Sequence, residues 1–436
     1  MTILIPLVLL SLVLPSAYAV ALLPAFWVLE RLFLPGLAIF TVGSIDVTAV
    51  DAVILILVAR LFIDIGRGRQ VVADARVYWA LALFAIVNLL ATLVAGAKFG
   101  ESHLVTCIVA LARVGATMLI VPIAAHAVTT ASQARRCMKI LVGTLGALAA
   151  IQFVNLIGAS HGFVIGEVQG LERGAPRYFG PVGDSVPFVL LLGYLIALSF
   201  GRFLFAGIFL VSILVTVGLG AIFTTAVGTL LFVMAARWAT GLSVVLQRRL
   251  WILPMVALSA GVIGLLYARP LVGPLIDRVT SGAYARSGGQ RLDTARAAGA
   301  MIADNPIFGV GYMGYQRALS RYASDRVVAI GRRDGSTANA NNQVLQSLTD
   351  SGIPGFLAFL TVVGAAAHSF ARVASRREHA FFSACYLGAL LWLISLAVSN
   401  LSAVWLLPSF GQMVLWILLG MSIALPRLLP APIPPR

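Results

Sequence analysis

Ten arginines, five aspartates and no lysine lie between Arg269 and Gln343. Arginine offers a planar fork of donors that matches phosphate oxygens, and it stays charged at any working pH. The surplus of five positive charges therefore indicates a site for an anionic ligand. For any single arginine, the simpler alternatives are a solvated loop or a contact with anionic headgroups. The ten are Arg269, Arg278, Arg286, Arg291, Arg296, Arg317, Arg321, Arg326, Arg332 and Arg333.

The rest of the chain is strongly apolar. Of 436 residues, 60% are hydrophobic and 11% charged, whereas a soluble domain is about half apolar and a quarter charged. A membrane helix needs about 20 apolar residues, and the first of the apolar runs is long enough for one broken pass or two. We therefore expect about twelve spans, near residues 2–41, 48–66, 77–97, 104–128, 138–159, 182–200, 203–219, 221–236, 250–268, 345–371, 380–398 and 405–425.

Short basic loops alternate with loops that are poor in basic residues, which sets the orientation. By the positive-inside rule, the basic loops are cytoplasmic, so the long arginine-rich loop lies on the opposite side and the C-terminus inside. The net charge of +15 reflects this topology and indicates no nucleic-acid partner. The cytoplasmic loops carry Arg67, Arg69 and Arg76, then Arg135, Arg136 and Lys139, then Arg237, Arg248 and Arg249, then Arg372, Arg376 and Arg377.

These patterns predict an all-α polytopic membrane protein in three parts. Residues 1–268 form nine or ten membrane helices with short loops, residues 269–343 form the long extracytoplasmic loop, and residues 344–436 form the last membrane helices and a cytoplasmic tail. Within the long loop, RLDTARAAGAMIAD has apolar residues at helical spacing, including Leu292, Ala298 and Ile302. This spacing predicts a short helix, which ends at Asn305 and Pro306.

Few charged residues fall within the apolar runs. Arg113 lies near the middle of one, where an unpaired charge costs a few kcal/mol or more, so it should face a ligand or a structural partner inside the bundle. Arg60 and Asp64 are four residues apart, a spacing that predicts a local ion pair on a helix.

Two segments, RLDTARAAGAMIADNPIFGVGYMGYQ and NANNQVLQSLTDSGIPGFLAFL, resemble the O-antigen ligase and polymerase family of bacterial envelope membrane proteins. An earlier stretch, RYFGPVGDSVPFVLLLGYL, corresponds to another family element. The matching residues are Arg177, Gly180, Asp184, Arg291, Asp304, Asn305, Pro306, Phe308, Gly309, Gly311, Asn342, Leu345, Gln346, Gly352, Ile353, Pro354 and Gly355.

Two positions depart from the family pattern. Asn341 occupies the position where the family usually has histidine, and Ala226, in TTAVG, replaces an arginine. Histidine is the usual general base near neutral pH, and an asparagine amide cannot accept a proton. A mechanism that relies on that histidine therefore cannot be transferred unchanged to this chain.

The resemblance implies transfer of a glycan from a polyprenyl (undecaprenyl) diphosphate carrier to an acceptor hydroxyl, on the periplasmic side of the bacterial inner membrane. The acceptor is a lipid A core for a ligase, or a lipid-linked oligosaccharide for a polymerase. The missing histidine favours a polymerase or a related exopolysaccharide enzyme, and both remain open. A polytopic transporter or lipid-linked sugar flippase is the alternative, although the halves of the chain show no internal repeat of the kind common in transporters.

This chemistry needs preorganised positive charge for the leaving diphosphate and an aligned acceptor. We expect neither a metal nor a cofactor. Arg177, Arg286 and Arg291 are expected to hold the diphosphate, with Arg113 or Arg321 in support. Among these, Arg291 also counts as catalytic.

The acceptor side of the expected site is formed by polar residues. Asn341 would orient the acceptor hydroxyl, and Asp184 or Asp293 is a candidate base, unless Asp293 pairs with Arg296. The expected acceptor or sugar contacts are Asn342, Tyr178 and Tyr312, the tyrosines having an interfacial aromatic belt as their alternative role.

Overall fold

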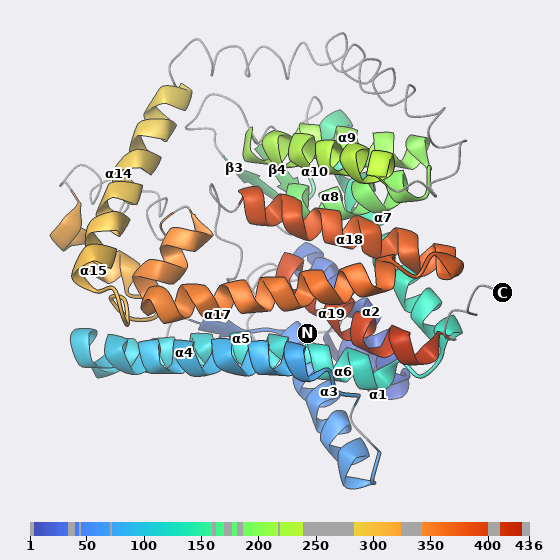
Figure 1. The fold of residues 1–436 in the computed structure, drawn as a ribbon, viewed down its shortest axis with the longest axis horizontal. Coiled ribbons are helices and arrows are strands. Elements are labelled where there is room, and N and C mark those ends of the chain that lie inside the picture. Colours follow the sequence, from blue (N-terminus) through green and yellow to red (C-terminus); the bar gives the residue numbers. More distant parts are fainter. Residues whose placement is uncertain are drawn as a thin grey trace.

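The protein is a bundle of helices (Figure 1). The computed structural model describes residues 4–33, 40–42, 45–69, 72–158, 163–169, 177–180, 186–216, 219–238, 283–323, 340, 342–399 and 410–429. The helices are α1 (Leu4–Val13), α2 (Ser16–Phe33), α3 (Ala49–Gly66), α4 (Ala75–Phe99), α5 (Glu101–Met118), α6 (Ile120–Ala127), α7 (Ala131–Gly158), α8 (Val186–Ser199), α9 (Phe203–Val215), α10 (Leu219–Trp238), α14 (Ala283–Asp304), α15 (Tyr315–Tyr322), α17 (Gln343–Ala374), α18 (Ala380–Ser399) and α19 (Phe410–Leu428).

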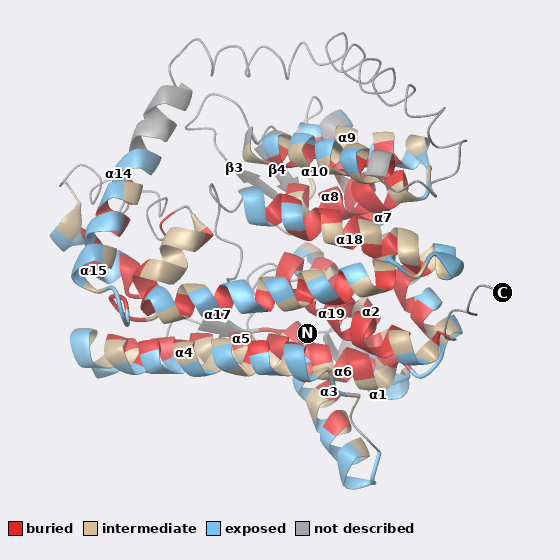
Figure 2. Cartoon of the chain, in the orientation of Figure 1, coloured by how far each residue is buried: buried red, intermediate tan, exposed pale blue. Residues whose placement is uncertain are grey.

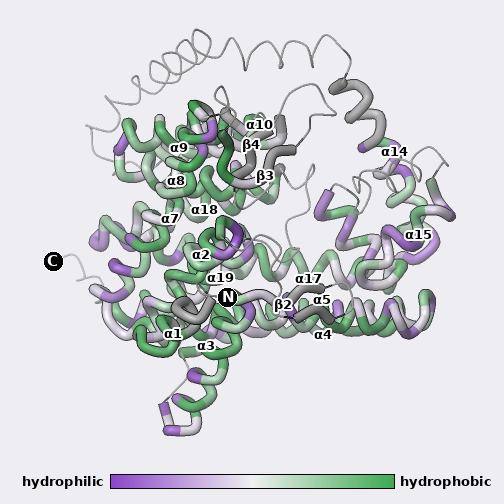
Figure 3. Tube along the Cα trace, turned by 180° about the vertical axis from the view of Figure 1, so that it is seen from behind, coloured by the Kyte–Doolittle hydropathy of each residue, from purple (hydrophilic) through white to green (hydrophobic). Residues whose placement is uncertain are grey.

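The polytopic membrane architecture is confirmed. Seven helical segments in the described part of the chain are long and apolar enough to cross a membrane, and α8, α9 and α10 are shorter apolar helices. Large apolar side chains such as Trp79 and Leu204 are about three-quarters exposed, as expected for surfaces that face lipid. Figure 3 shows hydrophobic residues along the bundle helices and more hydrophilic stretches on α14 and α15.

Eleven of the twelve predicted spans contain a helix, and the run 250–268 lies outside the described residues. The first run is broken at Pro15 into α1 and α2. At 1.5 Å per residue the ten residues of α1 reach only about 15 Å, which is half of the hydrocarbon core. One broken pass therefore fits this run better than two, while the total of twelve stays a prediction.

Helices α4 and α17 pack antiparallel along their length (Figure 1). At one end, which we call the basic end, the turn before α4 meets the C-termini of α17 and α19. Arg372 forms an ion pair with Asp74 at 3.0 Å, and Arg427 donates to the carbonyl of Ala73 at 3.0 Å. Two segments that the sequence assigned to the same side thus lie together, with α14 and α15 at the opposite end, which we call the loop end (Figure 1).

The core of the bundle surrounds α19, most of which is buried (Figure 2). Two large side chains of α18 bond to neighbouring helices: Trp392 Nε1 donates to the carbonyl of Phe188 at 2.7 Å, and the Tyr386 hydroxyl donates to that of Leu418, on α19, at 2.9 Å. Such bonds fix helix register where apolar packing alone is non-directional.

Two short antiparallel hairpins interrupt the helical pattern. β1 (Phe40–Val42) pairs with β2 (Ile45–Val47), and β3 (Glu167–Gln169) pairs with β4 (Arg177–Gly180), Gln169 opposite Arg177. Hydropathy did not predict these strands, which lie at the edges of the apolar runs or between them.

The predicted ion pair of Arg60 with Asp64 is wrong. Arg60 reaches back to α1 and donates to the carbonyls of Ser11, Leu12 and Leu14 at 2.9 to 3.0 Å. These carbonyls end a helix and lack intrahelical partners. Asp64 instead lies 3.3 Å from Arg69 and 3.6 Å from His126.

Candidate functional site

Two motif elements that are far apart in the sequence pack against each other at the loop end. The turn after α14 contacts α17 through two backbone hydrogen bonds: Val310 N donates to Thr349 O at 2.6 Å, and Ile353 N donates to Pro306 O at 2.9 Å. The helix α14 ends at Asp304, as the Asn305–Pro306 pair predicted. Two of the three motif stretches named from sequence therefore form a single structural unit, which we call the loop-end unit.

Glycine is required on both sides of this contact. Gly309 and Gly352 each have φ of 66°, a left-handed conformation that costs other residues about 1–2 kcal/mol. A Cβ on Gly309 would collide with the carbonyl of Thr349, and one on Gly352 with the carbonyl of Ile307. Each glycine thus allows the opposing backbone to approach.

Gly352 also divides α17. Its φ of 66° and ψ of −165° are not helical, so a short first helix ends there and the longer helix begins with Ile353 and Pro354. Proline suits the first turn of a helix because its missing N–H would have no partner there. The residues Gly352, Ile353, Pro354 and Gly355 therefore open the longer second part of α17.

A buried carboxylate connects the glycine turn with α17. Asp350 is 7% exposed. It accepts from Gln346 Nε2 at 2.6 Å and from the backbone N–H of Tyr315 at 3.4 Å. Gln346 in turn accepts from the backbone N–H of Ala340 at 2.8 Å. Asp350 and Gln346 therefore tie the start of α15 to the segment that precedes α17.

Arg291 is joined to the same unit through α14. The Tyr315 hydroxyl donates to the carbonyl of Thr294 at 3.2 Å, and the Thr294 hydroxyl donates to that of Arg291 at 2.9 Å. The Arg291 side chain itself is exposed. The backbone of Arg291 is thus held in place by α14, while its side chain lies exposed on the surface of that helix.

The buried face of α14 differs from the predicted one. Thr294, Ala298 and Met301 are fully buried, whereas Leu292 is 52% exposed. Ala298 and Met301 belong to a small apolar cluster with Val310, Tyr315 and Leu319. Of the residues predicted to form the apolar face, Ala298 is therefore buried as expected. The face is rotated because small residues, including Ala297, meet Tyr315 and Leu319.

Other cations surround the loop end, and we call Lys98, Arg317 and Arg321 the cationic rim. Lys98 Nζ donates to Asn305 Oδ1 at 2.7 Å and to the carbonyl of Gly309 at 3.0 Å. Arg317 and Arg321 are exposed on α15, with Arg321 near Lys98. The rim brings together positive charge from two parts of the chain.

Two tyrosines of the glycine turn are held near Asp350. Burial and the Asp350 carboxylate raise the pKa of Tyr312 and of Tyr315 well above the usual value, so both phenols stay protonated at neutral pH. Tyr315 is fully buried, whereas Tyr312 is partly exposed. Neither can serve as a base, and a sugar contact by Tyr312 is limited to the part of its side chain outside the buried hydroxyl.

Arg113 has a structural partner within the bundle. Its guanidinium lies 3.1 Å from Asp51 Oδ2, and its Nε donates to Asp51 Oδ1 at 3.2 Å. Asp51 also forms a capping box with Thr48 at the start of α3. This ion pair meets the expectation of a partner and gives Arg113 a role that needs no ligand.

Asn342 is the N-cap of α17. Its side-chain oxygen accepts from the backbone N–H of Leu345 at 3.0 Å. Capping explains an asparagine at this position without any sugar. Asp293 lies 3.4 Å from Arg296, and both are exposed, so the structure contains the salt bridge that was the alternative to a base.

Several expected site residues fall where the structure gives no side chain. Asn341 and Asp184 lie outside the described residues. Arg177 and Tyr178 are placed by backbone only, in β4, and Arg286 likewise in α14.

Sequence reasoning missed two residues of the site. Asp350 belongs to the NANNQVLQSLTDSG segment but was not singled out, because a lone aspartate before a glycine suggests a helix end. Lys98 directly follows the apolar run 77–97, a position that suggests only an anchor at the membrane interface. In neither case does the local sequence reveal the partner.

The described helices and the loop-end unit define a polytopic helical membrane protein whose motif segments meet outside the bundle. Residues 187–360 match the family model described as O-antigen ligase. The match confirms the predicted resemblance to the O-antigen ligase and polymerase family over this part of the chain. It includes Gly309 and Gly352, whereas Arg177 and Asp184 precede it. No curated protein matches the chain.

Proposed function

We propose that the chain transfers a glycan from a polyprenyl diphosphate carrier to an acceptor hydroxyl at the loop end, on the periplasmic side of the bacterial inner membrane. The family assignment supports glycan transfer of the ligase or polymerase type in general. The observation that supports this location is the packing of Gly309 against the Gly352 kink, beside exposed cations.

The reaction breaks the bond between the sugar anomeric carbon and the diphosphate oxygen, and forms a bond from that carbon to the acceptor oxygen. The acceptor loses its proton, and the diphosphate leaves with the bonding electron pair. Arginines can stabilise this negative charge through preorganised donors. We assign this role to Arg177, Arg286 and Arg291, and prefer Arg321 to Arg113 as support because Arg113 is already paired with Asp51.

The acceptor side centres on position 341. The residues on either side of it are hydrogen-bonded to α17, Ala340 through Gln346 and Asn342 as the helix cap. We propose that Asn341 orients the acceptor hydroxyl by hydrogen bonding. Of the two candidate bases, Asp184 is preferred because Asp293 lies in an exposed salt bridge with Arg296. Tyr178 and Tyr312 are proposed to contact the sugar.

The proposal is tested with purified protein in liposomes, given an undecaprenyl diphosphate glycan and either a lipid A core or a second lipid-linked glycan. Transfer should proceed in the presence of a chelator. The acceptor that receives the glycan decides between ligase and polymerase. If lipid crosses the bilayer while no glycan moves, the protein is a flippase.

Arg291 and Arg296 form a matched pair of variants on α14. Both are exposed, and Arg296 is already paired with Asp293. Arg291→Ala should abolish transfer, whereas Arg296→Ala should leave it nearly unchanged. Equal activity of the two variants would remove Arg291 from the site. Asn341→His should raise the rate if a base at this position can still reach the acceptor.

A further inference from the structure

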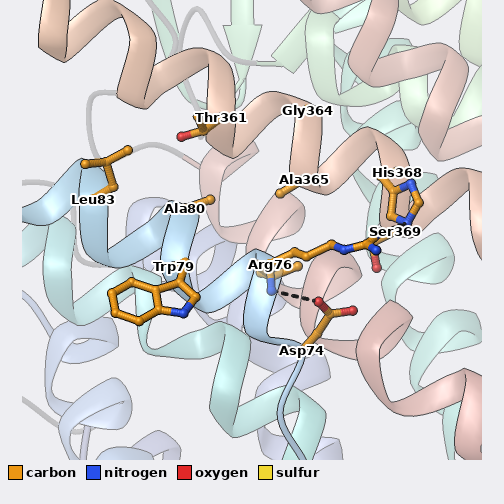
Figure 4. A pocket seen from close by; sticks show the side chains of 11 residues that line it. Asp74, Arg76, Trp79, Ala80, Leu83, Thr361, Gly364, Ala365, His368 and Ser369 are labelled. Carbon is orange, nitrogen blue, oxygen red and sulfur yellow. Dashed lines mark hydrogen bonds between the residues drawn. The ribbon is translucent and has the colours of Figure 1, made fainter.

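A groove of about 530 Å³ lies between α4 and α17 at the basic end, away from the loop-end unit. Its lining includes Arg76, Trp79, Leu83, Gly364 and His368 (Figure 4). This volume falls within the range of small-molecule sites, about 300 to 1,000 Å³. Both helices belong to candidate membrane spans, so the groove opens toward the lipid phase.

The walls of the groove suit an acyl chain. Trp79 is 74% and Leu83 42% exposed, and a Cβ added to Gly364 would meet no atom within 4 Å. The floor contributed by α17 is therefore open where a larger side chain would fill it. Tryptophan at this place is typical of the level of lipid headgroups.

Among the described residues, the mouth of the groove carries a surplus of positive charge. Asp74 is paired with Arg372 at 3.0 Å, whereas Arg76 contacts His368, its Nη1 lying 3.1 Å from Nε2. Since a guanidinium can only donate, Nε2 accepts and the ring proton resides on Nδ1. Arg427 adds a further positive charge beside Ala73. A guanidinium and an imidazole N–H can together bind a phosphodiester.

We propose that this groove binds one anionic phospholipid, its headgroup phosphate on Arg76 and His368 and an acyl chain along Trp79, Leu83 and Gly364. Basic pockets between membrane helices on the cytoplasmic side recognise anionic headgroups in this way. Placing this lipid in the cytoplasmic leaflet depends on the proposed membrane orientation, whereas the binding of the lipid in the groove does not. Glycan transfer does not enter the proposal, so the two can fail separately.

The test counts lipids bound to the full-length protein by native mass spectrometry, with phosphatidylglycerol or phosphatidylcholine added to the detergent solution. The wild type should retain one phosphatidylglycerol in preference to phosphatidylcholine. Arg76→Gln should weaken phosphatidylglycerol binding about fivefold, the effect of one cation at a membrane surface, while binding of phosphatidylcholine changes little. Equal retention of both lipids by the wild type, or unchanged selectivity in Arg76→Gln, would overturn the proposal.

A pair of glycine variants tests the groove itself. Gly364→Leu should remove the tightly bound lipid by occupying the groove. Gly143→Leu is the matched control because Gly143, on α7, is also exposed and its added Cβ would also meet no atom within 4 Å. Equal lipid loss in both variants would show that the effect is general, and the groove would not be the site. Size-exclusion profiles check that each variant is folded.

Discussion

Replacing Gly352 by alanine should destabilise the protein strongly, because the added Cβ is unfavourable for two reasons, the backbone conformation and a steric collision. The left-handed φ of 66° costs a residue with a Cβ about 1–2 kcal/mol. The added methyl group would also collide with the carbonyl of Ile307, and such overpacking costs about 1–3 kcal/mol. We expect a total loss of about 2–5 kcal/mol in the free energy of unfolding.

Gly309→Ala should behave in the same way, since Gly309 has the same φ and faces the backbone of Thr349 and Asp350. Both substitutions open the same contact. The double variant should therefore lose less stability than the sum of the single variants, by at least about 0.5 kcal/mol. Glycan transfer should fall in each variant, because the contact holds the turn that follows α14 against α17.

Gly364→Ala is the internal control on the same helix. Gly364 is helical and has open space at its Cβ position. Alanine there should raise stability by about 0.5–1 kcal/mol, the ordinary effect of replacing a glycine inside a helix.

The assay is equilibrium unfolding in mixed detergent and SDS micelles, followed by tryptophan fluorescence, with thermal midpoints as a second measure. If Gly352→Ala and Gly309→Ala unfold at the same SDS fraction as Gly364→Ala, the two glycines do not support a close backbone contact. Strict additivity of the two substitutions would refute the claim that they lie at one contact.

Three further predictions concern single features of the structure. Asn342→Ala should destabilise the protein by about 0.5–2 kcal/mol, while Asn342→Asp should retain the helix cap and most of the transfer activity; if transfer is lost in both variants at unchanged stability, Asn342 contacts substrate instead. Arg113→Gln should lower the thermal midpoint by leaving Asp51 without its partner, and adding Asp51→Asn should recover part of the loss; a further drop in the double variant would contradict the pairing. Cysteine introduced at Ser320, on α15, should react with an impermeant maleimide added to intact cells with a permeable outer membrane, whereas cysteine at Ser375 should react only after lysis; the native cysteines are buried, and the reverse pattern would invert the proposed orientation.

The elements that local sequence predicted well are those whose cause is local. Apolar runs of sufficient length predicted α4, α17 and α18 closely, because the bilayer fixes the length of a spanning helix. The Asn305–Pro306 pair predicted the end of α14 because proline restricts the residue before it. The family resemblance also named Gly309 and Gly352 as members of one motif set.

The misassigned features depend on residues far away in the chain. Arg60 has an aspartate four residues later, yet it binds the carbonyls that end α1. The short strands β3 and β4 pair across a gap in the sequence, and no hydropathy window detects such a pairing. Asp350 looks like an ordinary helix-end aspartate until Tyr315 and Gln346 enclose it.

The loop between Arg269 and Gln343 shows most clearly which features follow from sequence and which require the tertiary structure. Composition alone determined that it is too polar for lipid and rich in a phosphate-binding side chain. Only the tertiary structure decided that Gly309 meets the Gly352 kink and that Lys98, from a membrane helix, joins Asn305 beside Arg321. Charge and hydropathy are properties of contiguous residues, whereas a contact between two backbones depends on how distant helices pack.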